Sequence, residues 1–344
     1  MLSLATVFLA VAAFAACAVD IGGLHSARVR VNDRSDAEFK RGVSRALERV
    51  IVKLTGDSTT PRSDAGRSIV AQAKRLVQQF GYERPRNSSP NSNDLVLRVE
   101  FDARVLSEEM RSRNLVVWGK ERPETLVWLI IDNARGRKLL GAEDAHQMLR
   151  AVKNHAATRG IPLVFPLVDI GEASTLAEQV TSTALVQAVT ANSEKYAVSS
   201  ILLGHLRQIA PSLWENHWTL QVGAESIAWD QQGDIVELLV EDAIDGLADA
   251  LGRRYAGPAQ TGHRDAVAVT ITGLRSAADY ARTERYLSSL DSVVNLSVRR
   301  VDEHGIIFDL TVRGGLLTLS QSISFGQTLS PDPAHAAVFR LNPR

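Results

Sequence analysis

The hydrophobic pattern of this chain changes its period twice, and these changes constrain the fold more than any other feature. Up to about Trp118, apolar residues recur at helical spacing and then alternate as in half-buried strands. From about residue 121 to residue 257, continuously apolar runs of strand length alternate with helical segments. From about residue 265 the order is strand, helix, strand, strand. One sheet with one core does not fit all three patterns, so we expect three small domains.

The predicted fold class is therefore α/β and α+β. After removal of the first 18 residues the chain has about 325 residues, more than one hydrophobic core usually organises. The middle domain is expected to be a mixed sheet with helices, and the last a βαββ-type α+β module. The predicted division is a signal peptide (1–18), an N-terminal α+β domain (19–118), a middle α/β domain (119–258), a C-terminal α+β domain (264–328) and a flexible tail (329–344).

In the N-terminal domain, residues 27–31 alternate as a strand, and residues 35–38 form a capping box that starts a long helix. Gly56 is placed to end that helix, because glycine readily adopts the left-handed conformation at a helix end. A second helix is predicted over residues 69–80 and a strand over residues 95–101.

The same patterns predict the elements of the other two domains. The middle domain is expected to contain helices over residues 142–157, 173–191 and 235–251, and strands over residues 126–131, 161–165, 199–206 and 218–222. The C-terminal domain is expected to contain strands over residues 267–271, 295–301 and 306–312, and helices over residues 277–290 and 316–322.

Residues 4–16 are an apolar run that predicts export. The run has about 13 residues, too few to span a hydrocarbon core that needs about 20, and it ends at Ala16-Cys17-Ala18, a cleavage site of the A-x-A type. Its only positive charge is the amino terminus. The alternative is a lipoprotein anchored at Cys17, although Phe14 stands where a lipobox usually has leucine. We favour removal of the segment and a periplasmic protein.

Charge and cysteine content exclude several function classes. Thirty-nine basic residues balance 39 acidic ones, so no overall field attracts nucleic acid or an anionic membrane surface. Cys17 is the only cysteine, which excludes a disulfide scaffold and a cysteine nucleophile in the mature domains. No later apolar run has transmembrane length, so no integral membrane span is expected. No pattern indicates a cofactor or a metal site.

Several segments together resemble the DUF2066 family of uncharacterised exported bacterial proteins. This resemblance implies an exported protein of mostly Gram-negative bacteria, and because the family has no assigned activity it implies no catalytic residues. The middle domain also resembles in architecture the TolB amino-terminal domain and penicillin-binding-protein activators. The segments are residues 50–57 (VIVKLTGD), 99–102 (VEFD), 117–119 (VWG) with Arg122-Pro123, 126–129 (LVWL), and 201–204 (ILLG) before Trp214 and Trp218.

Asp132 is the strongest candidate for a polar site. It directly follows an apolar strand, and ligands of open α/β sheets bind outside the carboxyl ends of strands. With Arg135 and Arg137 beside it, the segment could bind an anion. We favour the alternative, a polar turn capped by Asp132, because no glycine-rich phosphate loop is present.

Two other groups of residues are candidate sites. Trp214 and Trp218 are the best candidates for an exposed aromatic surface that binds a glycan or a peptide. His205 and His217 could form a two-histidine metal pair across a hairpin, but a zinc site needs three or four ligands. Structural roles are favoured for both histidines.

The leading hypothesis is a non-enzymatic periplasmic protein that supports envelope assembly by contacting an envelope protein or the cell-wall polymer. Strand edges and the Trp214–Trp218 loop are the expected contacts. The first alternative is a hydrolase-like envelope enzyme that uses Asp132 with Asp102 or Asp169. The second is an outer-membrane lipoprotein accessory factor anchored at Cys17.

Overall fold

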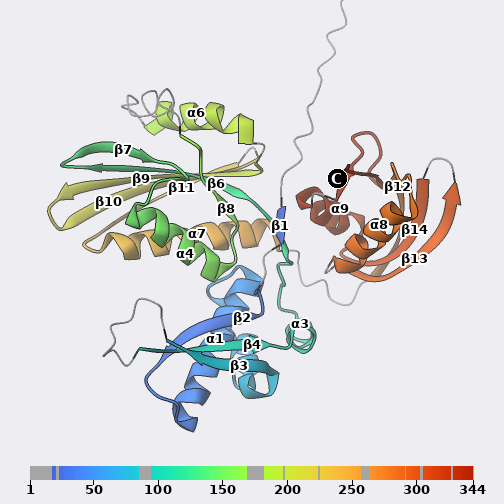
Figure 1. Ribbon diagram of the computed structural model, residues 1–344, viewed down its shortest axis with the longest axis horizontal. Helices are drawn as coiled ribbons and strands as arrows, with labels where there is room; N and C mark the ends of the chain where they lie inside the picture. The colour runs from blue at the N-terminus through green and yellow to red at the C-terminus, as the bar shows by residue number, and fades with distance from the viewer. Residues whose placement is uncertain are drawn as a thin grey trace, which may run out of the picture.

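The computed structural model describes residues 18–20, 23–84, 94–168, 182–196, 198–223, 225–256, 264–290, 292–302, 305–326 and 328–343. Three larger sheets of three, six and five strands form separate lobes, and a two-stranded sheet joins β1 (Ala18–Asp20) to β5 (Glu121–Pro123) (Figure 1). Each larger sheet has its own hydrophobic core. The predicted fold class, α/β and α+β in several small domains, is confirmed. Cys17 and nearly all of the predicted signal peptide lie outside the described residues.

The N-terminal sheet is antiparallel, in the order β2 (Ser26–Val31), β4 (Leu95–Phe101), β3 (Val77–Glu83), with α1 (Asp36–Thr55) packed on one face. The predicted ends of α1 are both present. The Ser35 hydroxyl accepts a hydrogen bond from the Glu38 amide, and Gly56 is left-handed with φ 73°. The remaining helical segments are η1 (Thr60–Arg62), α2 (Asp64–Val70), η2 (Ala73–Leu76) and α3 (Ala103–Ser112).

The helix predicted over residues 69–80 is wrong. The chain is helical to Val70 and again in η2, but from Val77 it is strand β3. Phe80 and Tyr82 pair with Val99 and Leu97 of β4 and lie on the face of the sheet that carries the core. Val77 and Phe80 are three residues apart, as on one face of a helix, whereas Phe80 and Tyr82 are two apart, as on one face of a strand, and pairing with β4 decides between them.

The middle sheet has the order β11 (Glu225–Gly233), β10 (Leu213–Val222), β9 (Ser200–Ala210), β6 (Thr125–Asn133), β7 (Gly136–Leu140), and β8 (Leu163–Val164) also pairs with β6. Strand β6 is parallel to β8 and β9, and the other pairs are antiparallel. Helices α4 (Gln147–Arg159) and α7 (Val236–Tyr255) cover one face, and α6 (Ser182–Ser193) lies on the other (Figure 1). The short helix η3 (Glu194–Tyr196) follows α6.

Two predicted helices of this domain have different limits. Helix α4 begins five residues later than predicted, because Asp144 accepts a hydrogen bond from the Gly141 amide in a turn and His146 caps the helix through Nδ1. The helix predicted over residues 173–191 is observed from Ser182, and its first part lies outside the described residues. Strands β7 and β11 were not predicted.

The C-terminal sheet has the order β13 (Val293–Asp302), β14 (Gly305–Arg313), β12 (Arg264–Thr272), β16 (Val338–Leu341), β15 (Leu329–Pro331). Helices α8 (Ala277–Ser289) and α9 (Gly315–Phe325) contribute to its core. The prediction of a flexible tail over residues 329–344 is wrong, because β15 and β16 complete this sheet. Phe339 is fully buried, and its strand runs parallel to β12.

The N-terminal and middle domains meet at a buried joint formed by Lys53, Gly56, Arg122, Arg159 and Gly252. A Cβ atom on Gly252 would lie 2.9 Å from the Gly56 Cα atom, so the two backbones are in direct contact. Arg159 is 6% exposed and donates to Asp249 of α7 (2.5 Å) and to the Gly56 carbonyl (3.2 Å). The domains are therefore joined by hydrogen bonds between buried groups as well as by packing.

The buried charge of Lys53 predicts an unusual pH dependence of stability. Burial, and then the neighbouring Arg122, lower the pKa of Lys53 from 10.5 to about 8. Below pH 8 the lysine is charged in both the folded and the unfolded chain, and the cost of burying its charge is fully present. Between the two pKa values the unfolded chain binds more protons, so stability rises with pH.

Relative to Lys53→Met, the free energy of unfolding of the native chain should increase by about 2 kcal/mol between pH 7.5 and pH 10. Urea denaturation of both proteins at several pH values measures this difference. A constant or falling difference over that window would show that Lys53 is not a buried charge.

Among the described residues, no helix combines the length and the apolar composition that crossing a bilayer requires.

Candidate functional sites

Asp132 and Arg137 face one another across the β6–β7 hairpin. The Asp132 carboxylate accepts hydrogen bonds from Nη2 (3.0 Å) and Nε (3.3 Å) of Arg137. Nε2 of His205, on the neighbouring strand β9, lies 3.7 Å from the same carboxylate. Arg135 is in the exposed turn, where its amide donates to Asn133 Oδ1 (2.8 Å). The structure therefore joins two of the three predicted residues and adds a histidine.

This arrangement continues across the sheet as a polar row. His217 of β10 lies directly opposite His205, and Asp230 of β11 lies opposite His217. Nδ1 of His217 is hydrogen-bonded to the Asp230 carboxylate. Because directly opposed side chains of antiparallel strands are about 5 Å apart, the two imidazoles are neighbours. We call Arg137, Asp132, His205, His217 and Asp230 the polar row.

The pKa of His205 is shifted below its usual value. Burial lowers its pKa most, and the nearby positive charge of Arg137 lowers it further, whereas Asp132 raises it. Nε2 of His205 is buried and makes no hydrogen bond within the described chain, since the carboxylate at 3.7 Å is too distant. This distance is longer than the hydrogen bond of about 2.6–3.2 Å between a catalytic histidine and its carboxylate.

Replacement of Asp132 by asparagine should lower the pKa of His205 further, because it removes the group that stabilises the imidazolium. The pKa is measured by following the His205 ring protons by NMR as a function of pH. Asp102→Asn, in the N-terminal domain, is the control and should leave the pKa of His205 unchanged. An unchanged or raised pKa of His205 in Asp132→Asn would contradict this electrostatic description.

The structure does not place Asp102 or Asp169, the other two residues of the predicted enzyme site, in the polar row. Asp102 belongs to the N-terminal domain, where its carboxylate caps α3 by accepting from the Val105 amide (2.9 Å). Asp169 lies outside the described residues. Over the described ranges, His, Cys, Asp and Glu side chains do not gather in groups of three or more that could hold a metal ion.

The two tryptophans do not form an exposed surface. Trp218 is fully buried in the core of the middle domain, and its ring lies against Gly204 on the adjacent strand. Trp214 is half-buried and packs against the same core. The prediction is wrong for Trp218, because its side chain points to the face that α7 covers. With Asn216 turned so that its side-chain oxygen faces the indole, Trp218 Nε1 donates to that oxygen (2.9 Å).

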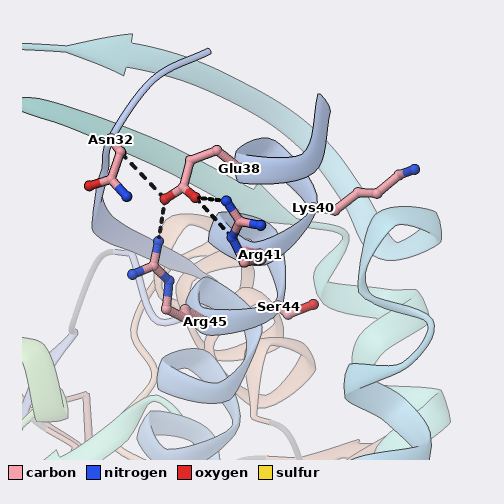
Figure 2. Close-up of a pocket in the computed structure, with 6 residues that line it drawn as sticks. All are labelled: Asn32, Glu38, Lys40, Arg41, Ser44 and Arg45. Atoms are coloured by element: carbon pink, nitrogen blue, oxygen red, sulfur yellow. Dashed lines mark hydrogen bonds and ion pairs between the residues drawn. The ribbon is translucent and has the colours of Figure 1, made fainter. Parts of the chain in front are cut away.

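A pocket near the start of α1 is the remaining candidate. Figure 2 shows Arg41 and Arg45 turned towards the carboxylate of Glu38, with Lys40 pointing away. Glu38 is 2% exposed and accepts hydrogen bonds from Arg41 Nε (2.9 Å), Arg45 (3.0 Å) and the Asn32 amide (3.3 Å). Hydrogen bonding by Arg41 lowers the pKa of Glu38. The carboxylate already holds both guanidinium groups, so this cluster ties α1 to the end of β2.

Sequence reasoning missed the residues of the buried joint. Arg122 is fully buried, and its guanidinium donates to main-chain carbonyls and lies over the Trp118 ring at 4.2 Å from the ring centre. Arg159 joins Asp245 and Asp249 of α7, and Asp245 also contacts His155. The sequence did contain one indication of this contact. Asp245 and Asp249 are one helical turn apart and therefore lie on the same face of α7, where they can bind one basic side chain.

Residues 18–119 match the family model of a domain of unknown function, DUF8605. The matched part contains the N-terminal sheet and α1, whereas the middle and C-terminal domains lie outside it. The resemblance to DUF2066 and to TolB-like domains is wrong, since the family found is a different one. Residues 50–57, which contributed to the resemblance, form the buried end of α1 and its glycine cap, so helix packing and capping explain their pattern. No curated protein matches the chain.

Proposed function

We propose that this protein is an exported, non-enzymatic binding protein of the bacterial periplasm, which supports envelope assembly by contacting another envelope protein. The observation that carries the proposal is that the carboxylates of the candidate sites are already paired with side chains of the protein. Asp132 holds Arg137, Asp230 holds His217, and Glu38 holds two arginines. Arg137 and the two arginines at Glu38 link neighbouring elements of the fold, and the His217–Asp230 pair lies at solvent-exposed positions, with 38% and 70% of the two side chains accessible, so we assign these groups structural roles.

The sequence supports the location. Residues 4–16 have the length and the small-residue ending of a secretory signal. A protein of several small domains, with charge balanced overall, offers contact surfaces without a general attraction to polyanions.

The proposal is tested by fractionation and crosslinking of the full chain with a carboxyl-terminal tag in a Gram-negative host. We expect the tagged protein in the osmotic-shock fluid, both as the native chain and as Cys17→Ser. Membrane fractionation that is lost in Cys17→Ser would replace the proposal with a lipoprotein. A cytosolic location would contradict it outright.

Crosslinking in the same cells separates binding from catalysis. We expect one envelope protein to be crosslinked equally by the native chain and by Asp132→Asn. If Asp132→Asn abolished the cellular phenotype of the gene while the crosslinked partner was unchanged, a catalytic role near Asp132 would be favoured instead.

A further inference from the structure

Strand β11 is the exposed end of the middle sheet. It has nine residues, and its register with β10 is unbroken from Trp214–Gly233 to Val222–Glu225. Its residues are exposed or half-buried throughout, and Ile227 is 41% exposed. Because alternate residues of a strand direct their N–H and C=O groups to opposite sides, half of the β11 backbone groups point away from β10.

The other terminal strands of the described sheets are each protected against added strands. Strand β2 is blocked by three basic side chains of α1, which donate to carbonyls along its outer edge: Arg45 to Arg30, Arg49 to Arg28 and Lys53 to Ser26. Strands β3 and β13 contain bulges, and β13 also carries Arg299 and Arg300. The remaining terminal strands have two to five residues: β1, β5, β7, β8 and β15.

None of these protective features is present in β11. It has no proline, no lysine, no arginine and no bulge, and within the described chain no side chain outside β10 bonds to its backbone. Long, regular and unprotected edges are rare in proteins that must avoid pairing, since they are templates for another strand. This edge is therefore suited to accept one.

We propose that β11 binds an extended, basic segment of a partner protein, which pairs with it as an additional strand. This proposal rests on the proposed function and specifies its contact surface. Asp230 and Glu225 lie on opposite faces of the strand, and Asp234 follows it. Glu225 is paired with Arg254 of α7 (2.7 Å), whereas the Asp230 side chain, which is hydrogen-bonded to His217, is 70% exposed and is open to a cation of the added strand. Pairing with β11 of a second copy would bring the Asp230 carboxylates of both copies to the same face of the new pair without a lysine or arginine on either strand, which disfavours self-association.

The side chains of β11 define what the added strand carries. Asp230 lies on the face of the polar row, and Ile227 and Trp229 lie on the opposite face, where the Trp229 ring packs over Gly246 of α7. An added strand would place alternate side chains beside these two sets. The matching segment has a basic residue beside Asp230 and, on its other face, an apolar residue beside Ile227; the remaining β11 residues on the Asp230 face are uncharged.

The test uses the purified full chain and two ten-residue peptides. One alternates lysine with valine, and the other has glutamate in place of each lysine. We expect fluorescence anisotropy to detect binding of the basic peptide only, and hydrogen exchange to slow at alternate amides of β11. Binding should weaken about tenfold or more in Asp230→Lys. Glu108→Lys, an equal change of charge on the exposed side of α3, is the control and should have no effect.

Backbone pairing is tested separately by Ile227→Pro and Ala228→Pro, since one of two adjacent amides faces the open edge. The variant that remains folded by circular dichroism should lose peptide binding.

Equal binding of both peptides, or binding unaffected by Asp230→Lys and by proline, would overturn the proposal. A dimer of the native chain that Asp230→Lys changes would assign the edge to a second copy. This assay does not depend on export, so it can fail while the protein is periplasmic, and it can succeed while the protein is not.

Discussion

Replacing Arg122 with alanine is expected to lower the free energy of unfolding by about 4 kcal/mol or more. The guanidinium is fully buried and donates to five main-chain carbonyls, which belong to both sides of the joint: Lys53 (2.5 Å), Gly119 (3.1 Å), Trp118 (3.3 Å), Arg159 (3.1 Å) and Gly160 (2.9 Å). Alanine would leave these acceptors buried without their donor. A buried carbonyl that loses its partner costs about 1–3 kcal/mol, and partial hydration of the cavity limits the sum.

The loss of Arg122 should also change the shape of the unfolding curve. Because Arg122 bonds to carbonyls of the N-terminal and the middle domain, its removal should separate their unfolding into two transitions in urea. Arg122→Lys should be intermediate, since an ammonium group keeps the charge but reaches fewer carbonyls. Arg135→Ala, in an exposed turn, is the control and should change stability by less than about 0.5 kcal/mol. An Arg122→Ala protein as stable as the native chain would contradict this account of the joint.

Local sequence patterns were sufficient to predict those helices and strands whose ends are marked by capping residues or by the limits of an apolar run. The Ser35 cap and Gly56 define α1, and the continuous apolar run of β6 matches a strand covered by α6 on one face and by α4 and α7 on the other. Strand β3 was predicted as a helix because its apolar spacing fits both periods. Strand β16 is only four residues long, and its place depends on pairing with β12, almost 70 residues earlier in the chain.

Contacts in the candidate sites that come from neighbouring sequence could also be predicted, whereas contacts between distant segments could not. The proximity of Asp132 and Arg137 follows from a short hairpin, which the sequence contains even though strand β7 was not predicted. His205 and Asp230 join them only through the order of strands in the sheet. The Arg122 guanidinium donates a hydrogen bond to the Lys53 carbonyl, and the two residues are 69 positions apart in the chain. No local sequence pattern indicates this contact. Interactions of this kind can be recognised only once the domains are placed together.

Gly204→Ala is expected to destabilise the middle domain by about 3 kcal/mol. Gly204 lies directly opposite Trp218 on the adjacent strand, and a Cβ atom added to it would lie 2.3 Å from the indole ring. The ring is fully buried beneath α7, so it cannot move aside without displacing the core.

The measurement is urea denaturation followed by tryptophan fluorescence, with Gly81→Ala as the control. Gly81 has open space around its Cα atom, and alanine there should be tolerated. A double variant, Gly204→Ala with Trp218→Phe, should recover part of the loss, because the smaller ring makes room for the methyl group. A neutral Gly204→Ala would contradict the close packing of the Trp218 ring against Gly204 in the core.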